Sequence, residues 1–246
     1  MSYQDFAQFY DLLTENIDYR ELAAPYLNAL RSFKISEGSS LLDLACGSGN
    51  FSVLMEEYGY NVTGADLSEE MLTAAAAKSD SIRWLRTDMT NLPFNSEFDS
   101  VICCLDSINH LEDLDAIQKT FDGVYRSLKK GGIFAADLNT PFKHMKVLAD
   151  NAFIFDYEGF FCSWQNELDA ESPLCRVDMF LDFFKENKDG SYTRYTDSLS
   201  EIAPRPDTVI QMLTESGFAV KSVKDFPSGK KLRPKSEKYM LVAQKE

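Results

Sequence analysis

The sequence has little of what disulfide-linked, zinc-binding or membrane proteins need. Only two of its 246 residues are histidine, and its five cysteines are odd in number and show no C-x-x-C spacing. No apolar run approaches the roughly 20 residues that cross a bilayer. Residues 1–5 lack the basic and apolar regions of a signal peptide. We therefore expect a reduced, cytoplasmic protein with no metal site, no disulfides and no membrane segment.

Positive charge is also scarce. Lysines and arginines number 25 against 39 aspartates and glutamates, which gives a formal net charge of −14. Such a chain repels polyphosphate at long range, so nucleic acid is an unfavourable partner. The segment 221–238 is the exception, because lysine and arginine outnumber Asp225 and Glu237 there. Two interpretations fit it: a patch for a phosphorylated or carboxylated substrate, or a solvated hairpin, which we favour.

The most informative stretch that is present runs from Leu41 to Asn50, and Asp66 stands sixteen residues after its end. Gly47 and Gly49 let the backbone turn sharply and approach a ligand where a Cβ would collide. An acid at the end of the following strand can accept hydrogen bonds from both hydroxyls of a ribose. This arrangement predicts a nucleotide-binding βαβ unit and an adenosine-containing cofactor.

The details of this stretch distinguish two kinds of adenosine cofactor. Nicotinamide dehydrogenases show G-x-G-x-x-G, and Ser52 stands here in place of the third glycine. The stretch instead resembles motif I of the class I S-adenosylmethionine (SAM)-dependent methyltransferases, which reads acid-x-G-x-G-x-G. Asp43 takes the acidic position and Ala45 replaces the first glycine. Gly47 and Gly49 keep the next two.

The hydrophobic pattern predicts alternating helices and strands. Expected helices span 3–16, 18–33, 50–58, 113–129 and 206–216, with another beginning at Ser68. Expected strands span 40–44, 61–65, 82–86, 100–105, 133–138, 218–225 and 238–244. This alternation indicates an α/β fold with a doubly wound parallel sheet.

The pattern changes between residues 151 and 200, where eleven aromatic side chains gather. Apolar and polar residues alternate over 177–184, and Lys188-Asp189-Gly190-Ser191 is typical of a hairpin turn. We expect an antiparallel insert of about three strands after the fifth strand of the sheet. Its aromatic side chains fit a hydrophobic substrate cover, a core, or a contact between two copies in a homodimer.

From about residue 38 to its end, the chain resembles a class I SAM-dependent methyltransferase of the small-molecule type. Residues 64–68 match motif II, 87–89 match motif III, and 98–106 match motif IV. Residues 6–11 resemble a bacterial group related in layout to glycine N-methyltransferase. The resemblance implies a seven-stranded Rossmann-like sheet of order 3-2-1-4-5-7-6, with strand 7 antiparallel.

The resemblance also implies which residues hold SAM. The acid of motif II binds the ribose and the next residue packs on adenine, whereas the acid of motif III accepts the adenine amino group. The implied SAM-binding residues are Tyr10, Asp43, Ala45, Cys46, Gly47, Gly49, Asn50, Asp66, Leu67, Asp88, Met89 and Leu105. The Asn-Pro-Pro-Tyr signature of nucleobase amino-methylating enzymes does not follow the fourth strand, where residues 106–110 read Asp-Ser-Ile-Asn-His.

Candidate catalytic residues lie beyond the carboxyl ends of the fourth and fifth strands, where ligands bind in such sheets. Asp106 and His110 follow the fourth strand, and a histidine there can take a proton from a hydroxyl or an amine. His144 follows the fifth strand less closely. Tyr10 is the third catalytic candidate because the resembling group places a tyrosine near the methyl group. Simple packing remains the alternative for His110 and Tyr10.

These features lead to one functional expectation with two alternatives. We expect a methyltransferase that transfers the SAM methyl group to a small soluble acceptor by in-line displacement. Residues 1–36 would form a helical lid, 37–140 with 201–246 the SAM-binding domain, and 141–200 a substrate cover. A tRNA or protein methyltransferase is one alternative, and a SAM-binding protein without turnover is the other.

Overall fold

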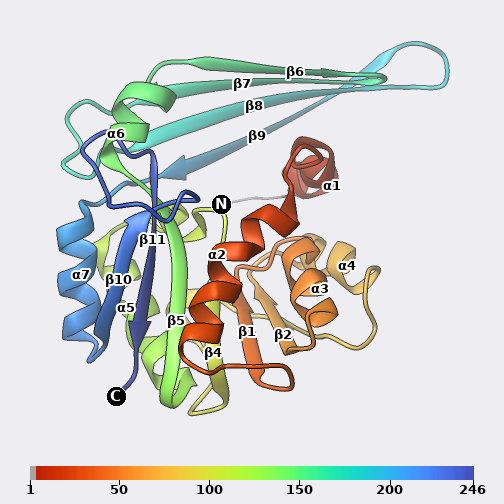
Figure 1. Cartoon of the computed structure of the whole chain (residues 1–246). Helices are drawn as coiled ribbons and strands as arrows, with labels where there is room; N and C mark the ends of the chain where they lie inside the picture. Colours follow the sequence, from red (N-terminus) through yellow and green to blue (C-terminus); the bar gives the residue numbers. More distant parts are fainter. Residues whose placement is uncertain (1–3) are drawn as a thin grey trace.

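The chain is built around a large central sheet, shown in Figure 1, and a computed structural model describes residues 4–246. The strands of this sheet are β1 (Ser40–Leu44), β2 (Asn61–Asp66), β3 (Arg83–Arg86), β4 (Phe98–Cys103), β5 (Leu128–Asn139), β10 (Ala219–Asp225) and β11 (Lys238–Gln244). Their order is β3-β2-β1-β4-β5-β11-β10, and β11 alone runs antiparallel to β5. The expected order 3-2-1-4-5-7-6 with an antiparallel seventh strand is confirmed.

Helices cover both faces of this sheet. They are α2 (Tyr19–Ser32), α3 (Asn50–Glu57), α4 (Glu69–Ala76), α5 (Leu114–Ser127) and α7 (Pro206–Glu215). Apolar side chains of α2 and α3 pack on one face, and those of α5 and α7 pack on the other. The Asp18 carboxylate caps α2, and the Ser68 hydroxyl caps α4 by accepting a hydrogen bond from the Met71 N–H. No helix within residues 4–246 is long and apolar enough to cross a membrane.

Two strands differ from the prediction by two or more residues at an end. β4 spans Phe98–Cys103 rather than 100–105, because Leu105 and Asp106 adopt left-handed φ angles of 55° and 53° that end the strand. The chain then enters a short 3-10 helix, Ser107–His110. β5 begins at Leu128, where the predicted helix 113–129 was expected to continue. The predicted start of the first helix, residue 3, lies outside the described residues.

The insert has four antiparallel strands, so the expectation of about three is wrong. They are β6 (Ala152–Tyr157), β7 (Phe160–Leu168), β8 (Val177–Glu186) and β9 (Tyr192–Glu201), paired in chain order. Only Glu158 and Gly159 separate β6 from β7, so the sequence shows almost no break between these two strands. Gly159 has φ of 72°, which a tight hairpin turn requires. The expected turn at 188–191 does connect β8 with β9.

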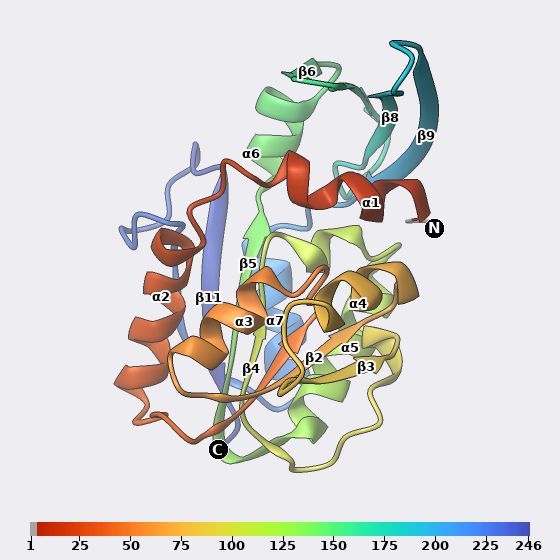
Figure 2. The ribbon, with the colours of Figure 1, turned by 90° about the vertical axis from the view of Figure 1, so that its right-hand side faces the viewer.

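Helix α1 (Gln4–Leu13) lies between the insert and the central domain, as Figure 2 shows. On the insert side, the Phe9 ring packs 5.0 Å from Phe160 and 4.9 Å from Phe183, measured between ring centroids. On the other side, Asp11 Oδ1 accepts a hydrogen bond of 2.6 Å from the Ser48 hydroxyl. Asp11 Oδ2 accepts one of 2.7 Å from Lys78 Nζ. Helix α1 therefore connects the insert to the loop that follows β1.

Candidate active site

The loop between β1 and α3 has a backbone that its glycines make possible. Gly47 and Gly49 have φ angles of 54° and 81°. A Cβ on Gly49 would lie 2.7 Å from the Trp84 side chain and 2.8 Å from the Cβ of Ala75. The Gly47 N–H donates a hydrogen bond of 2.8 Å to Asp66 Oδ2. The two halves of the nucleotide signature, loop and acid, are thus in direct contact.

Asp43 lies beneath this loop rather than on its surface. Its side chain is buried, and its Oδ2 accepts a hydrogen bond of 2.5 Å from the Ser52 hydroxyl. Burial raises the pKa of Asp43 to about 7, although the Ser52 hydroxyl opposes this shift. Ser52, which stands where a dehydrogenase would have its third glycine, therefore has a partner of its own. The sequence alone did not indicate this contact.

The acids expected to bind ribose and adenine both border a cavity of about 720 Å³. Asp66 Oδ1 accepts a hydrogen bond of 2.9 Å from the Ser68 N–H, and burial raises the pKa of Asp66. Asp88 accepts hydrogen bonds from the Thr90 N–H and hydroxyl, both 2.8 Å long. Leu67, which is 52% exposed, lies beside Asp66 at the cavity wall. An exposed leucine at this place offers an apolar surface to a flat ring.

Most of the predicted SAM-binding residues line this one cavity. They are Tyr10, Ala45, Gly47, Asp66, Leu67, Asp88, Met89 and Leu105. Asp43, Cys46 and Asn50 instead line a smaller cavity that also touches Tyr10, Ala45 and Leu105. Asn50 turns toward α1, where its Nδ2 donates a hydrogen bond of 2.9 Å to Asp11 Oδ1. Gly49 packs behind the loop, against Trp84 and Ala75.

Asp106 lies at the far end of the large cavity and is held by two partners. Its Oδ1 accepts a hydrogen bond of 2.8 Å from Lys238 Nζ, and its Oδ2 accepts one of 2.5 Å from Asn139 Nδ2. Burial would raise the pKa of Asp106, but Lys238 and Lys143 outweigh it and hold that pKa well below the usual range. Asp106 is therefore ionised at neutral pH and is a weak proton acceptor.

Lys238 is a site residue that the sequence interpretation missed. It belongs to the basic segment 221–238, whose interpretation as a solvated hairpin is wrong for this residue. As the first residue of β11 it is paired with Asn139, the last residue of β5. Its side chain therefore lies at the edge of the sheet where the carboxyl ends of the parallel strands meet. Lys221, in the same segment, forms a surface ion pair of 2.5 Å with Glu246. The segment therefore offers less free positive charge than its composition indicates.

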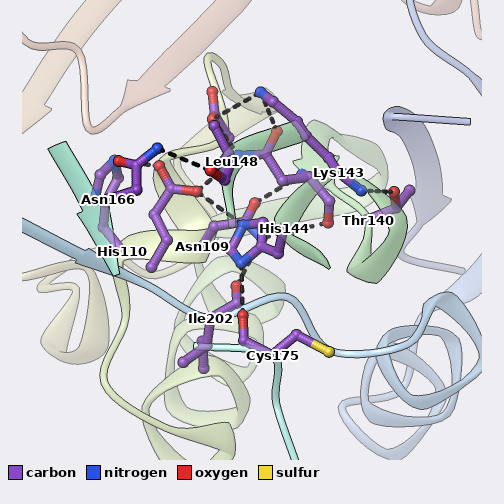
Figure 3. Close-up of polar contacts among 12 residues, drawn as sticks. Asn109, His110, Thr140, Lys143, His144, Leu148, Asn166, Cys175 and Ile202 are labelled. Carbon is purple, nitrogen blue, oxygen red and sulfur yellow. Dashed lines mark hydrogen bonds and ion pairs between the residues drawn. The ribbon is translucent and has the colours of Figure 1, made fainter. Parts of the chain in front are cut away.

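A single carboxylate, that of Glu201, reaches both histidines of the chain. Its Oε2 lies 3.1 Å from His144 Nε2, and its Oε1 lies 3.6 Å from His110 Nε2. His144 is fully buried and donates from Nδ1 to the Cys175 carbonyl over 2.7 Å. Figure 3 shows His144 at the centre of these contacts, with Cys175 on one side and His110 on another. Of the two histidines, only His110 borders the cavity.

Tyr10 covers the cavity from α1. A Cβ on Gly47 would lie 3.8 Å from Cε1 of the Tyr10 ring, so the ring sits over the loop. Burial and the nearby Tyr19, Asp106 and Asp66 raise the pKa of the Tyr10 phenol. The phenol therefore keeps its proton and can donate a hydrogen bond.

Known proteins share this arrangement. Residues 41–132 match a family described as a methyltransferase domain. YqeM of Bacillus subtilis (strain 168), a protein named as a methyltransferase, is 32% identical to this chain over 249 residues. The aligned residues cover 100% of this chain and 98% of YqeM. The crystal structure of a SAM-dependent methyltransferase from Clostridium acetobutylicum ATCC 824 superimposes with a TM-score of 0.86 at 30% identity, covering 98% of both chains.

A third relative is the glycine/sarcosine N-methyltransferase of Aphanothece halophytica. It is 29% identical over 195 residues, which cover 77% of this chain and 69% of its own. The chain therefore belongs to the class I SAM-dependent methyltransferases, as its motifs indicated. It is an enzyme whose methyl donor is SAM.

Proposed function

We propose that this methyltransferase acts on a small soluble molecule inside the cavity that runs from Asp66 to Glu201. That cavity carries the proposal, because it is bordered by the nucleotide-binding residues at one end and by Asp106, His110 and Glu201 at the other. Its volume of about 720 Å³ lies within the range of roughly 300–1,000 Å³ typical of small-molecule sites. SAM and a small acceptor would share it.

The two covering elements would shape the acceptor end. Trp164 and Leu199 of the insert line the cavity, and so do Leu13 and Ile17 of the N-terminal segment. We therefore assign residues 1–36 the role of a lid and residues 141–200 that of a substrate cover. A cavity enclosed in this way favours acceptors that fit beneath the insert over nucleic acids or folded proteins. The net charge of −14 also opposes nucleic acid.

Methyl transfer from SAM would proceed by in-line displacement. The acceptor's lone pair forms a bond to the methyl carbon while the carbon–sulfur bond breaks, and its electron pair stays on sulfur. The protein's main contribution is to hold the two reactants in line, which can lower the barrier by about 7–11 kcal/mol in favourable cases. His110 is the imidazole that borders the cavity, so it is the base we assign to an acceptor that must lose a proton. Tyr10 would close the site over the methyl group.

The experiment that tests this proposal follows the methyl group. The purified enzyme is incubated with methyl-labelled SAM and a cell extract, which is then separated into small molecules, RNA and protein. We expect the label in the small-molecule fraction, at a level that rises with enzyme concentration. Label confined to RNA or protein would contradict the proposal. SAM binding without label in any fraction would favour the alternative of a binding protein without turnover.

A further inference from the structure

Glu201 is a buried carboxylate whose two oxygens have different surroundings. Its side chain is 6% exposed and borders the large cavity. Oε2 accepts a hydrogen bond of 2.7 Å from Asn139 Nδ2 and lies 3.1 Å from His144 Nε2. Oε1 lies 3.6 Å from His110 Nε2, which is beyond hydrogen-bond length. Oε2 is therefore fixed by protein groups, while Oε1 has capacity for another hydrogen-bond donor.

Within residues 4–246 no lysine forms an ion pair with Glu201, whose ion-pair partners there are His110 and His144. Lys238 contacts Asp106 at 2.8 Å and Asp137 at 3.5 Å. Lys143 Nζ donates a hydrogen bond of 2.9 Å to the Asn139 side-chain oxygen and lies 4.0 Å from Asp106. These two lysines thus face the three carboxylates of Asp106, Asp137 and Glu201. A cationic or hydrogen-bond-donating ligand group at Oε1 would complement this balance.

We propose that the acceptor is an amine and that Glu201 Oε1 binds the reacting nitrogen. This inference rests on the proposed function, since the amine would occupy the acceptor end of the same cavity. An amine that arrives protonated first transfers one proton to His110. Its nitrogen lone pair then forms the bond to the methyl carbon, the carbon–sulfur electron pair stays on sulfur, and S-adenosylhomocysteine leaves. The positive charge that sulfur loses appears on nitrogen, beside the Glu201 carboxylate.

The state of the carboxylate favours an amine over a hydroxyl acceptor. Burial raises the pKa of Glu201, but the hydrogen bond with His144 is the largest of the effects that together hold this pKa below its usual range. The carboxylate consequently stays ionised at neutral pH, which suits it to stabilise developing positive charge and not to take a proton. A hydroxyl acceptor needs a strong proton acceptor and develops no such charge.

The inference can be tested without knowing the acceptor, by comparing two SAM analogues. S-adenosylhomocysteine lacks the transferable methyl group, and sinefungin carries an amine-bearing carbon in place of the methylsulfonium. The affinities of both are measured by calorimetry on the wild type, Glu201→Gln and Glu186→Gln. The last variant is the matched control, since Glu186 is an exposed glutamate at the end of β8 in the same insert.

We expect the wild type and Glu186→Gln to bind sinefungin about 10-fold or more tightly than S-adenosylhomocysteine. A hydrogen bond to a charged group accounts for a factor of about 10 to 100. Glu201→Gln should lose this preference while binding S-adenosylhomocysteine as the wild type does. An unchanged preference in Glu201→Gln would overturn the inference. Failure of the wild type to bind either analogue would instead count against the proposed function.

A second measurement uses only the wild type, in case the glutamine variant does not fold. The labelled small molecule formed from methyl-labelled SAM is isolated, and the atom that carries the new methyl group is identified by mass spectrometry and NMR. Methyl on nitrogen is the expected result. Methyl on oxygen, sulfur or carbon would show that Glu201 does not select an amine.

Discussion

Replacing Gly49 with alanine is expected to weaken SAM binding by about 10- to 100-fold. The new Cβ would come within 2.8 Å of both Trp84 and Ala75, so the loop must move from the conformation that the cofactor needs. Overpacking of this kind costs about 1–3 kcal/mol, and the binding-competent fraction falls in proportion. Calorimetric titration of the variant with SAM measures the effect.

The control for this prediction is Gly38→Ala. Gly38 has the same φ of 81° as Gly49, but a Cβ there would meet nothing within 4 Å. Both alanines carry the cost of a left-handed conformation, about 1–2 kcal/mol, and only the one at Gly49 collides with neighbours. SAM affinity should therefore be unchanged in Gly38→Ala. Equal losses in both variants would mean that backbone strain, and not the collision, limits binding.

Replacing Lys238 with methionine is expected to destabilise the whole fold by about 3–5 kcal/mol. The substitution removes the cation that Asp106 and the fully buried Asp137 share, and removing one partner of a buried ion pair costs about this much. For a chain of this length the loss corresponds to a fall in Tm of about 10 °C. Thermal unfolding followed by circular dichroism measures it.

Two further variants separate the ion pair from the loss of a lysine as such. Lys221→Met removes the partner of Glu246 at the surface, where ion pairs contribute little to stability, and should leave Tm nearly unchanged. Combining Lys238→Met with Asp106→Asn removes one of the two carboxylates that lose Lys238, so the double variant should recover part of the stability. A double variant with no higher Tm than Lys238→Met would show that the ion pair between Lys238 and Asp106 does not stabilise the fold.

Much of the fold was predictable because its signals are local. The capping residues Asp18 and Ser68 act within a few residues of their partners. The turn glycines and Asp66, the last residue of β2, lie in one short βαβ unit, in which Gly47 and Asp66 are 19 positions apart. The sheet order came from the family resemblance and is confirmed. The fourth strand of the insert was missed because a two-residue turn at Gly159 leaves almost no break in the pattern.

The acceptor end of the site was less predictable because its partners meet only in three dimensions. Lys238 reaches Asp106 across 132 positions of sequence, through the register that pairs β11 with β5. Glu201 meets His144 across 57 positions of sequence, because β9 returns from the insert to the carboxyl ends of the parallel strands. Asn50 was expected at the cofactor, yet its side chain bonds Asp11, since the position of α1 has no local signal.

The measurement that tests the account most directly is calorimetric titration of the wild type and Asp66→Ala with SAM, S-adenosylhomocysteine and NAD. Asp66 joins the glycine loop to the cavity, so its carboxylate should carry the ribose contact. We expect micromolar binding of SAM and its demethylated product by the wild type, no binding of NAD, and loss of SAM binding in Asp66→Ala. Full SAM affinity in the variant, or none in the wild type, would contradict this placement of the cofactor.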